Sequence, residues 1–359
     1  MKLKLFFLTI VALWSLTTLA QEKRLATIAQ EYGLPGMQVV HVKKGKQRSL
    51  VYGKKNTDST ALITEHTVFQ AASLTKVITA YTFFRLYDQG LIKLDQPLAS
   101  YFTYSRLANN VAGKLVTARM VLTHRTGFLN WEGPVGSAAW YQTPLNNQFE
   151  PGAQYKYSGE GFYYLQLVME KVTGKSFREL VQQEVLDPLG MKNSDMQWND
   201  EKFKDFSYGH YDAKKVRRLA KWSYTNAAYT LYTTATDYTK FVQQALVLGK
   251  GLKPKTYQLM VNKANEAQKE VGVLSEDDKH VPVALGMRIQ YNETGTWLWH
   301  TGSNPGFRCF FIVNPKTKES LVGFSNADSG MPAFNALMEA FLAKGQTFWA
   351  YKWRNGELD

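Results

Sequence analysis

The stretch Ser73-Leu74-Thr75-Lys76 is the only Ser-x-x-Lys in the chain, and a pattern of apolar residues at helical spacing follows it until Gly90. In a helix, positions three apart share one face, so the Lys76 amine is predicted to reach the Ser73 hydroxyl. A serine needs such a base to become a nucleophile near neutral pH. About one match of this kind is expected by chance, so the motif gains its meaning from the segments downstream.

The N-terminal segment has the pattern of a secretory signal. Lys2 and Lys4 precede an apolar run over residues 5–16, and small residues close the segment at Ala20. This order predicts a signal peptide over residues 1–20 and an exported protein. An uncleaved membrane anchor is the alternative, although the run is short for a full span, and no later stretch is long and apolar enough to cross a bilayer.

Composition narrows the classes of partner. The single cysteine, Cys309, excludes an intrachain disulfide, and its apolar and aromatic neighbours predict a buried strand position. Export without disulfides fits a Gram-negative periplasm. Lys and Arg number 43 against 30 Asp and Glu, a net charge of +13. Because these charges are scattered over apparent turns, they favour solvated loops, then an anionic envelope surface, and disfavour nucleic acid.

Strand patterns lie at both ends of the chain and helical patterns lie between them. The predicted strands are residues 37–42, 49–52, 296–300, 307–313 and 320–325. The predicted helices after the first are residues 161–173, 176–188, 234–249 and 333–343. The simplest fold class for this order is α/β (α+β). One antiparallel sheet would be built from both ends of the chain, with a helical insertion between them.

The predicted division of the chain follows from this order. A sheet-containing domain would combine residues 21–95 with residues 285–359, and a mostly helical domain would comprise residues 96–284.

Two further segments stand at positions where chemistry is common. Tyr157-Ser158-Gly159 lies in a loop just before a helical pattern, and His300-Thr301-Gly302-Ser303 lies where a strand ends and turns. A glycine at such a strand end lets the backbone approach closely, and N–H groups there can hold an anion. Taken singly, each segment has an ordinary structural explanation as a loop or as a strand end.

Together, the Ser-x-x-Lys, Tyr-Ser-x and His-Thr-Gly segments, in this order and at these separations, resemble the serine β-lactamase and penicillin-binding protein superfamily. The class C-like branch, which also holds D-stereospecific peptidases and esterases, is the most similar. Residues 122–127 resemble its Leu-Thr-His-x-Ser-Gly segment, and residues 187–191 resemble its Pro-Leu-Gly-Met turn. The resemblance covers nearly all of the chain after the signal. It implies a β-lactamase/transpeptidase-like fold with the active site in a cleft between the two parts.

The resemblance also implies the nucleophile and its base. Ser73 would be acylated, at the N-terminus of a buried helix whose dipole favours negative charge there. Lys76 and Tyr157 would share the proton transfers, and a neighbouring amine and phenol titrate as a coupled pair.

The remaining implied roles concern binding. The backbone N–H groups of Ser73 and Ser303 would form the oxyanion hole. His300, where the family has Lys or His, would line the cleft together with Thr301 and Gly302 and contact the substrate or the tyrosine. No cofactor is implied, and the chain has no zinc-binding motif, so no metal ligands are predicted.

One departure from the family concerns substrate recognition. Gly159 stands where the second motif usually has Asn, which in the family helps to hold the lysine and the amide carbonyl of the substrate's acylamino chain. Glycine offers only backbone groups, so recognition of β-lactams by the usual contacts is not expected unless Ser158 or Glu160 compensates.

Aromatic residues just after the segment over residues 122–127 form a second point of interest. Phe128, Trp131, Trp140 and Tyr141 follow it closely and could wall a substrate cleft, although core packing is the default for such residues.

The sequence therefore predicts an exported serine hydrolase that acts through an acyl-enzyme on a small peptide, amide or ester, such as a cell-wall fragment. A class C-like β-lactamase is the alternative within the same chemistry. A non-catalytic protein that binds cell-wall fragments is the alternative outside it, disfavoured because Ser73, Lys76 and Tyr157 are all present.

Overall fold

The structure, a computed structural model, describes residues 19–268, 270 and 272–355. The predicted signal peptide lies outside the described residues except for its last two positions, which open a helical segment that continues to residue 31. Among the described residues, no helix is long and apolar enough to cross a membrane.

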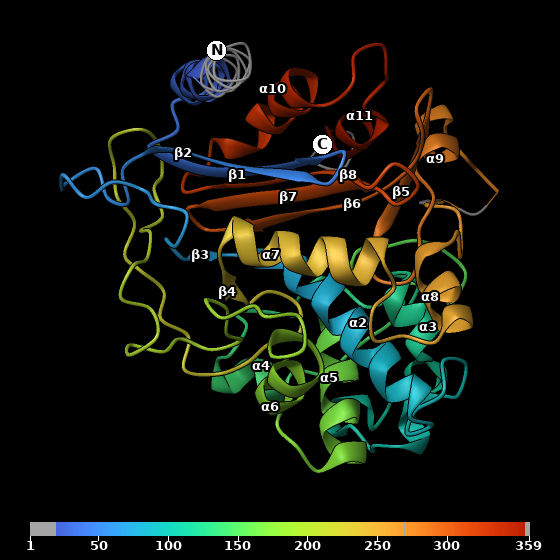
Figure 1. Cartoon of the computed structure of the whole chain (residues 1–359). Coiled ribbons are helices and arrows are strands. Elements are labelled where there is room, and N and C mark those ends of the chain that lie inside the picture. Colours follow the sequence, from blue (N-terminus) through green and yellow to red (C-terminus); the bar gives the residue numbers. More distant parts are fainter. Residues whose placement is uncertain (1–18, 269, 271, 356–359) are drawn as a thin grey trace, which may run out of the picture.

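A six-stranded antiparallel sheet forms the centre of the fold, and both ends of the chain contribute to it (Figure 1). This confirms the predicted sheet, and β5, which the sequence pattern did not reveal, adds an edge strand. In the order β2-β1-β8-β7-β6-β5, the strands are Lys46–Gly53, Gly36–Lys43, Glu319–Ser325, Phe307–Asn314, Gly295–Asn304 and Arg288–Asn292.

The first hairpin shows how local sequence determines strand register. Lys43 pairs with Lys46, and the two residues between them, Lys44 and Gly45, have φ of 50° and 74°. A two-residue turn with both φ values positive matches the right-handed twist of the flanking strands. The turn joins the two strands that were predicted over residues 37–42 and 49–52.

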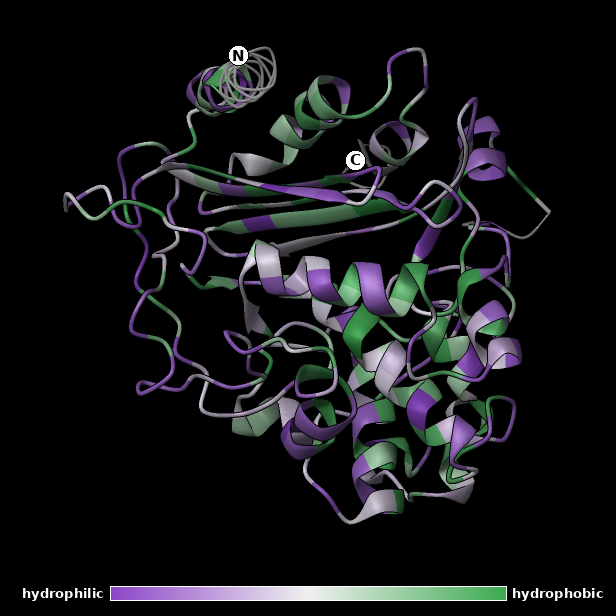
Figure 2. Ribbon diagram, viewed as in Figure 1, coloured by the Kyte–Doolittle hydropathy of each residue, from purple (hydrophilic) through white to green (hydrophobic). Residues whose placement is uncertain are grey.

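Both faces of the sheet are covered, which explains why its central strands are buried along nearly their whole length. On one face, Trp299, Phe310 and Ile312 pack with residues of the N-terminal helical segment, of α10 (Gly330–Phe341) and of α11 (Trp349–Asn355). On the other face, Phe311 and Phe324 contact Tyr238 of α7 (Ala235–Phe241). Figure 2 shows hydrophobic residues along the strands and the nearest helices, with more hydrophilic residues in the outer loops.

Most of the remaining helices form the larger layer below the sheet in Figure 1. They are α2 Thr75–Asp88, α3 Ala118–Leu122, α4 Ala138–Gln142, α5 Gly159–Thr173, α6 Phe177–Val181 and α8 Pro254–Val261. Helix α9, Glu276–His280, lies outside this layer and contacts α11 and β5. Single 3₁₀ turns cover Ala72–Leu74, Leu98–Ser100, Ser105–Leu107 and Ala112–Leu115, and π turns extend α6 over Gln182–Leu186 and α7 over Val242–Val247. A short two-stranded sheet pairs β3 (Phe69–Gln70) with β4 (Tyr232–Thr233).

Helix α2 lies in the middle of this layer and is buried on almost every side. It contacts α5, α6 and α8, whereas α7 contacts β1 and β8. The predicted division at residues 95 and 96 assigns α2 to the sheet part and α7 to the helical part. In the structure, α2 therefore packs among the helices and α7 packs on the sheet, each outside the part to which the predicted division assigns it.

Side-chain caps set the helix starts that the sequence patterns indicated. Ser176 and Glu179 form a capping box at the start of α6, where the sequence predicts a helix from residue 176, with the Ser176 N–H donating to Glu179 Oε2 at 2.9 Å. Thr234 Oγ1 accepts the Asp237 N–H at 3.0 Å and caps α7. Helix α5 begins at Gly159, two residues before the expected start, because Ser158 Oγ caps it by accepting the Gly161 N–H.

Candidate active site

Ser73 lies in the tight 3₁₀ turn that leads into α2, and it is more exposed than the buried residues on either side of it. Ala72, the residue before it, has φ of +46°, a left-handed conformation that costs a non-glycine residue about 1–3 kcal/mol and occurs often at functional sites. Thr75 Oγ1 donates to the Ala72 carbonyl at 2.6 Å and Cys309 Sγ donates to the Ala71 carbonyl at 2.9 Å. These contacts hold the turn in its strained form and present the serine outward.

Lys76 is buried beneath Ser73, with 1% of its surface exposed. Its Nζ donates to Ser73 Oγ at 3.3 Å and to the Ala228 carbonyl at 3.0 Å, so the predicted reach between amine and hydroxyl is confirmed. Burial lowers the pKa of Lys76 from 10.5 to about 7. A large fraction of Lys76 is therefore neutral at physiological pH and able to take a proton from the serine.

Tyr157, in the loop before α5, lies beside the same amine. Lys76 Nζ is 4.7 Å from the centroid of its ring, and the Tyr157 and His300 rings are 6.4 Å apart. The structure thus brings together side chains from three segments far apart in the chain. The arrangement offers a hydroxyl nucleophile, an amine of lowered pKa and a phenol within one small volume.

His124, inside the segment over residues 122–127, also belongs to this cluster, although the sequence pattern indicated no role for it. Its ring stacks on Tyr157 with the centroids 4.3 Å apart, and its Nδ1 accepts the Ser158 N–H at 3.1 Å. Burial, and then the positive charges of Lys76, Arg288 and His300, hold its pKa well below 6.5. The neutral ring packs against Tyr157. Its place in the Leu122–Gly127 segment was the sequence signal that could have pointed to it.

Strand β6 brings the third segment against the nucleophile turn. A Cβ at Gly302 would lie 2.4 Å from Cys309 Sγ and 2.6 Å from the Ala71 carbonyl oxygen, so only glycine allows this approach. Ser303 follows it, is exposed and pairs in register with Arg308. The backbone of residues 302 and 303 therefore runs directly beside the turn that carries Ser73.

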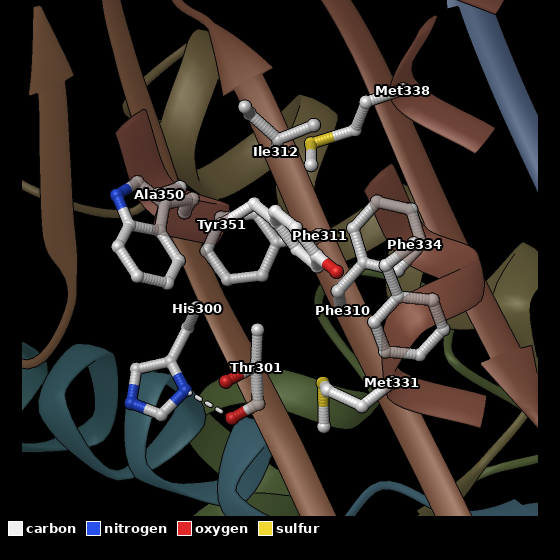
Figure 3. Close-up of a pocket in the computed structure, with 11 residues that line it drawn as sticks. His300, Thr301, Phe310, Phe311, Ile312, Met331, Phe334, Met338, Ala350 and Tyr351 are labelled. Atoms are coloured by element: carbon white, nitrogen blue, oxygen red, sulfur yellow. Dashed lines mark hydrogen bonds between the residues drawn. The ribbon is translucent and has the colours of Figure 1, made fainter. Parts of the chain in front are cut away.

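His300 and Thr301 point to different surroundings. His300 Nδ1 donates to the Thr301 carbonyl at 2.6 Å. Figure 3 shows this bond, and it shows Thr301 beside a small apolar cavity lined by Phe310, Met331 and Phe334 among others. The predicted cleft residue Thr301 thus also borders the packing between the sheet and α10.

Gly159 is covered by an indole ring. A Cβ at Gly159 would lie 2.3 Å from Cζ2 of Trp131, so a larger residue would collide with this ring. Of the other aromatic residues that were expected near the cleft, Phe128 and Trp140 are buried and Tyr141 is 44% exposed.

Neither neighbour of Gly159 offers a side chain that replaces the amide of the asparagine expected at position 159. Ser158 Oγ donates to the Leu129 carbonyl at 2.9 Å while it caps α5. Glu160 is completely buried and forms a two-point ion pair with Arg106, at 2.8 and 3.1 Å. The compensation that the sequence left open is therefore not made by these two side chains.

No group of three or more His, Cys, Asp or Glu side chains within the described part of the chain is arranged to hold a metal ion.

Several known proteins are similar to this chain in sequence. The family model described as Beta-lactamase matches residues 22–343. Protein flp of Staphylococcus aureus strain MW2 is 22% identical over 316 residues, 84% of this chain and 61% of that protein. A protein named Beta-lactamase from Pseudomonas fluorescens is 25% identical over 223 residues, 60% of this chain and 61% of that protein. This chain thus spans about three fifths of the length of these curated relatives.

Solved structures share the fold at low sequence identity. One described as a class C beta-lactamase has a TM-score of 0.75 at 19% identity and covers 90% of this chain and 96% of its own. The D-alanine carboxypeptidase AmpC from Burkholderia cenocepacia has a TM-score of 0.73 at 19% identity, covering 90% of this chain and 98% of its own.

Proposed function

This chain belongs to the β-lactamase family of serine hydrolases, and we propose that it acylates Ser73 and then hydrolyses the acyl-enzyme, with a peptide, amide or ester as substrate. The observation that carries the proposal is the buried Lys76 amine, hydrogen-bonded to Ser73 Oγ at 3.3 Å with its pKa lowered to about 7. A buried lysine with no role would only destabilise the fold. A neutral amine beside a serine hydroxyl can take its proton and so makes the hydroxyl oxygen a nucleophile.

The chemistry follows from these groups. Neutral Lys76 accepts the Ser73 proton as Oγ attacks the substrate carbonyl carbon, and the negative charge that develops on the carbonyl oxygen is held by the Ser73 and Ser303 N–H groups. The proton then passes through Lys76 and Tyr157 to the leaving nitrogen or oxygen as the carbonyl bond to it breaks. Water then attacks the carbonyl carbon of the acyl-enzyme ester at Ser73. The same groups remove a proton from the water, and Ser73 Oγ leaves and is protonated again to a hydroxyl.

His300 takes part in binding rather than in proton transfer to the serine. Its ring faces Tyr157 at a centroid distance of 6.4 Å, and its Nδ1 is already engaged with the Thr301 carbonyl. We assign to it a contact with the substrate or with the Tyr157 phenol, beside Thr301 and Gly302 on the same strand.

A class C-like β-lactamase is the second candidate, and the fold similarity at a TM-score of 0.75 favours it. The glycine at position 159, with Ser158 and Glu160 both engaged inside the fold, argues for a peptidase or esterase instead. Slow or absent cephalosporin turnover is therefore the expected behaviour.

A substrate panel tests the proposal directly. Wild type and Ser73→Ala are compared on p-nitrophenyl esters, D-amino-acid amides and nitrocefin, and on labelling by a fluorophosphonate probe. Wild type is expected to be labelled at Ser73 and to hydrolyse an ester or amide, and Ser73→Ala to do neither. Equal labelling of Ser73→Ala would contradict the assignment of the nucleophile, and rapid nitrocefin hydrolysis would replace the first candidate by the second.

Export belongs to the same proposal. The charged and apolar N-terminal pattern supports cleavage near residue 21 and a periplasmic location. N-terminal sequencing of the protein from a periplasmic fraction is the measurement, and an intact first residue in the cytoplasmic fraction would contradict it.

A further inference from the structure

The space beside the catalytic loop is filled by an indole. Gly159 does not have a positive φ, so its backbone conformation would accept any residue. What forbids a side chain there is Trp131, whose Cζ2, Cη2 and Cε2 would lie 2.3–2.7 Å from a Cβ. The glycine is therefore matched to the ring, and Gly159 and Trp131 form one structural unit.

Trp131 is held rigidly because the residues on both sides of it are bound to the start of α5. The Gly159 N–H donates to Asn130 Oδ1 at 2.9 Å, and the Glu160 N–H donates to the Asn130 carbonyl at 3.1 Å. Glu160 Oε1 accepts the Glu132 N–H at 3.0 Å. These bonds hold the chain on both sides of Trp131 against the start of α5.

The buried Glu160 carboxylate also binds Trp140, whose ring packs against Trp131. Glu160 Oε1 also accepts Trp140 Nε1–H at 2.6 Å, and the Trp140 ring lies edge-on to Trp131 with centroids 6.1 Å apart. Arg106 balances the carboxylate in the interior, with both side chains 1% exposed or less. A buried ion pair costs desolvation energy, which is consistent with a role in fixing geometry.

Trp131 also packs against Tyr229, which is adjacent in the chain to the residue that binds Lys76. Trp131 contacts Tyr229 edge-on at 5.7 Å, and Tyr229 contacts Trp222 edge-on at 5.1 Å. Tyr229 follows Ala228, whose carbonyl binds Lys76 Nζ, and its own carbonyl accepts from Asn304 Nδ2 at 3.3 Å, next to Ser303. Trp131 and Tyr229 are both partly buried rather than fully enclosed.

From this placement we propose that Trp131, with Tyr229, forms the acyl-side wall of the site and selects substrates whose acyl group is apolar or aromatic and carries no acylamino substituent. The proposal rests on the function proposed above. Asn130 Oδ1, Ser158 Oγ and Glu160 Oε1 each already accept a backbone N–H group of the protein. A flat ring contributes contact area and edge-to-face interactions with an aryl group, but it gives no partner to an amide.

Three p-nitrophenyl esters that share one leaving group isolate the acyl side: phenylacetate, acetate and N-acetylglycinate. For wild type, kcat/KM is expected to be highest for the phenylacetate and lowest for the N-acetylglycinate. Trp131→Ala should lower kcat/KM for the phenylacetate about tenfold while changing that for the acetate less than about threefold. Trp131→Phe, which keeps a smaller ring, should lie between the two and serves if the alanine variant does not fold.

A double variant tests the matched pair. Gly159→Asn alone should lose activity on all three esters, because the new side chain collides with the indole. Combined with Trp131→Ala, it should regain acetate hydrolysis and raise the N-acetylglycinate to phenylacetate ratio of kcat/KM about tenfold or more above wild type. Trp349→Ala is the matched control, since it removes a partly buried tryptophan that stacks on His280 at 4.0 Å, in α11.

The outcomes separate the two proposals. If Ser73 is labelled by the fluorophosphonate and the acetate is hydrolysed, but Trp131→Ala leaves the ester ratios unchanged, the acyl-side wall is wrong and the hydrolase stands. If wild type neither hydrolyses an ester nor is labelled, the proposed function fails and this inference fails with it.

Discussion

Lys76 Nζ lies 3.3 Å from Ser73 Oγ and 4.7 Å from the centre of the Tyr157 ring, inside a site where the lysine is 1% exposed. The amine has one carbonyl partner, Ala228, and burial alone accounts for its lowered pKa. The lowered pKa of Lys76 beside Ser73 therefore depends on the exclusion of water from the amine.

The pH dependence of acylation should report the Lys76 pKa of about 7. The reactive form is the neutral amine, so the rate of Ser73 labelling should rise about tenfold per pH unit below 7 and level off above it. Stopped-flow labelling between pH 5 and 9 is the measurement. Lys76→Arg, which stays charged, should lose the reactive form at every pH, and a flat wild-type profile would rule Lys76 out as the base.

His124 should make the fold sensitive to acid. Its pKa is lowered in the folded protein, so below 6.5 the unfolded chain binds a proton that the folded chain does not. Stability should therefore fall as the pH drops below 6.5, with this residue contributing up to about 1.4 kcal/mol per pH unit.

His124→Asn provides the test. Asparagine tolerates the φ of +55° at this position and can still accept the Ser158 N–H. Urea unfolding at pH 7.5 and pH 5.0 should show a smaller acid loss in the variant than in wild type. An equal loss in both proteins would mean that other groups account for it.

The ion pair between Arg106 and Glu160 should be essential to stability. Glu160→Gln leaves the buried guanidinium without its counter-charge, which is expected to cost about 3–5 kcal/mol of unfolding free energy. Arg119 and Asp95 form a similar two-point pair at the surface, with 36% and 65% of the side chains exposed. Arg119→Ala should cost less than about 1 kcal/mol, and chemical denaturation compares the two. Similar losses would argue against a special role for the buried pair.

Gly302 should control the distance between β6 and the nucleophile. Gly302→Ala places a methyl group 2.4 Å from Cys309 Sγ and 2.6 Å from the Ala71 carbonyl, so the strand must move away from the turn. Displacing one oxyanion donor is expected to lower kcat about 10²–10³-fold with a smaller change in KM.

Cys309→Ala is the companion variant, and it removes the thiol contact to the Ala71 carbonyl. It should keep kcat within about threefold of wild type, because a thiol is a weak donor. Steady-state kinetics on one ester distinguishes the two variants, and a wild-type kcat in Gly302→Ala would show that this approach does not position the donor.

Several features of this protein could be predicted from short stretches of sequence. The i, i+3 spacing of Ser73 and Lys76 placed the amine beside the hydroxyl because a helix has a fixed periodicity. The turn between β1 and β2 and the caps at Ser176 and Thr234 depend on residues within a few positions of one another. Strand patterns at both ends were sufficient to predict one antiparallel sheet.

The contacts that define the site's surroundings could not be predicted in this way. His124 reaches Tyr157 across 33 positions of the chain, and Trp131 reaches Gly159 across 28. Burial of Lys76, and with it a pKa near 7, requires Ala228 and Phe162 to close around the amine. The sequence by itself determined which groups can react, because bonding chemistry and local periodicity are properties of the residues. Only the tertiary structure decided their protonation and the shape of the space before Ser73, because both depend on which distant segments exclude water from the same place.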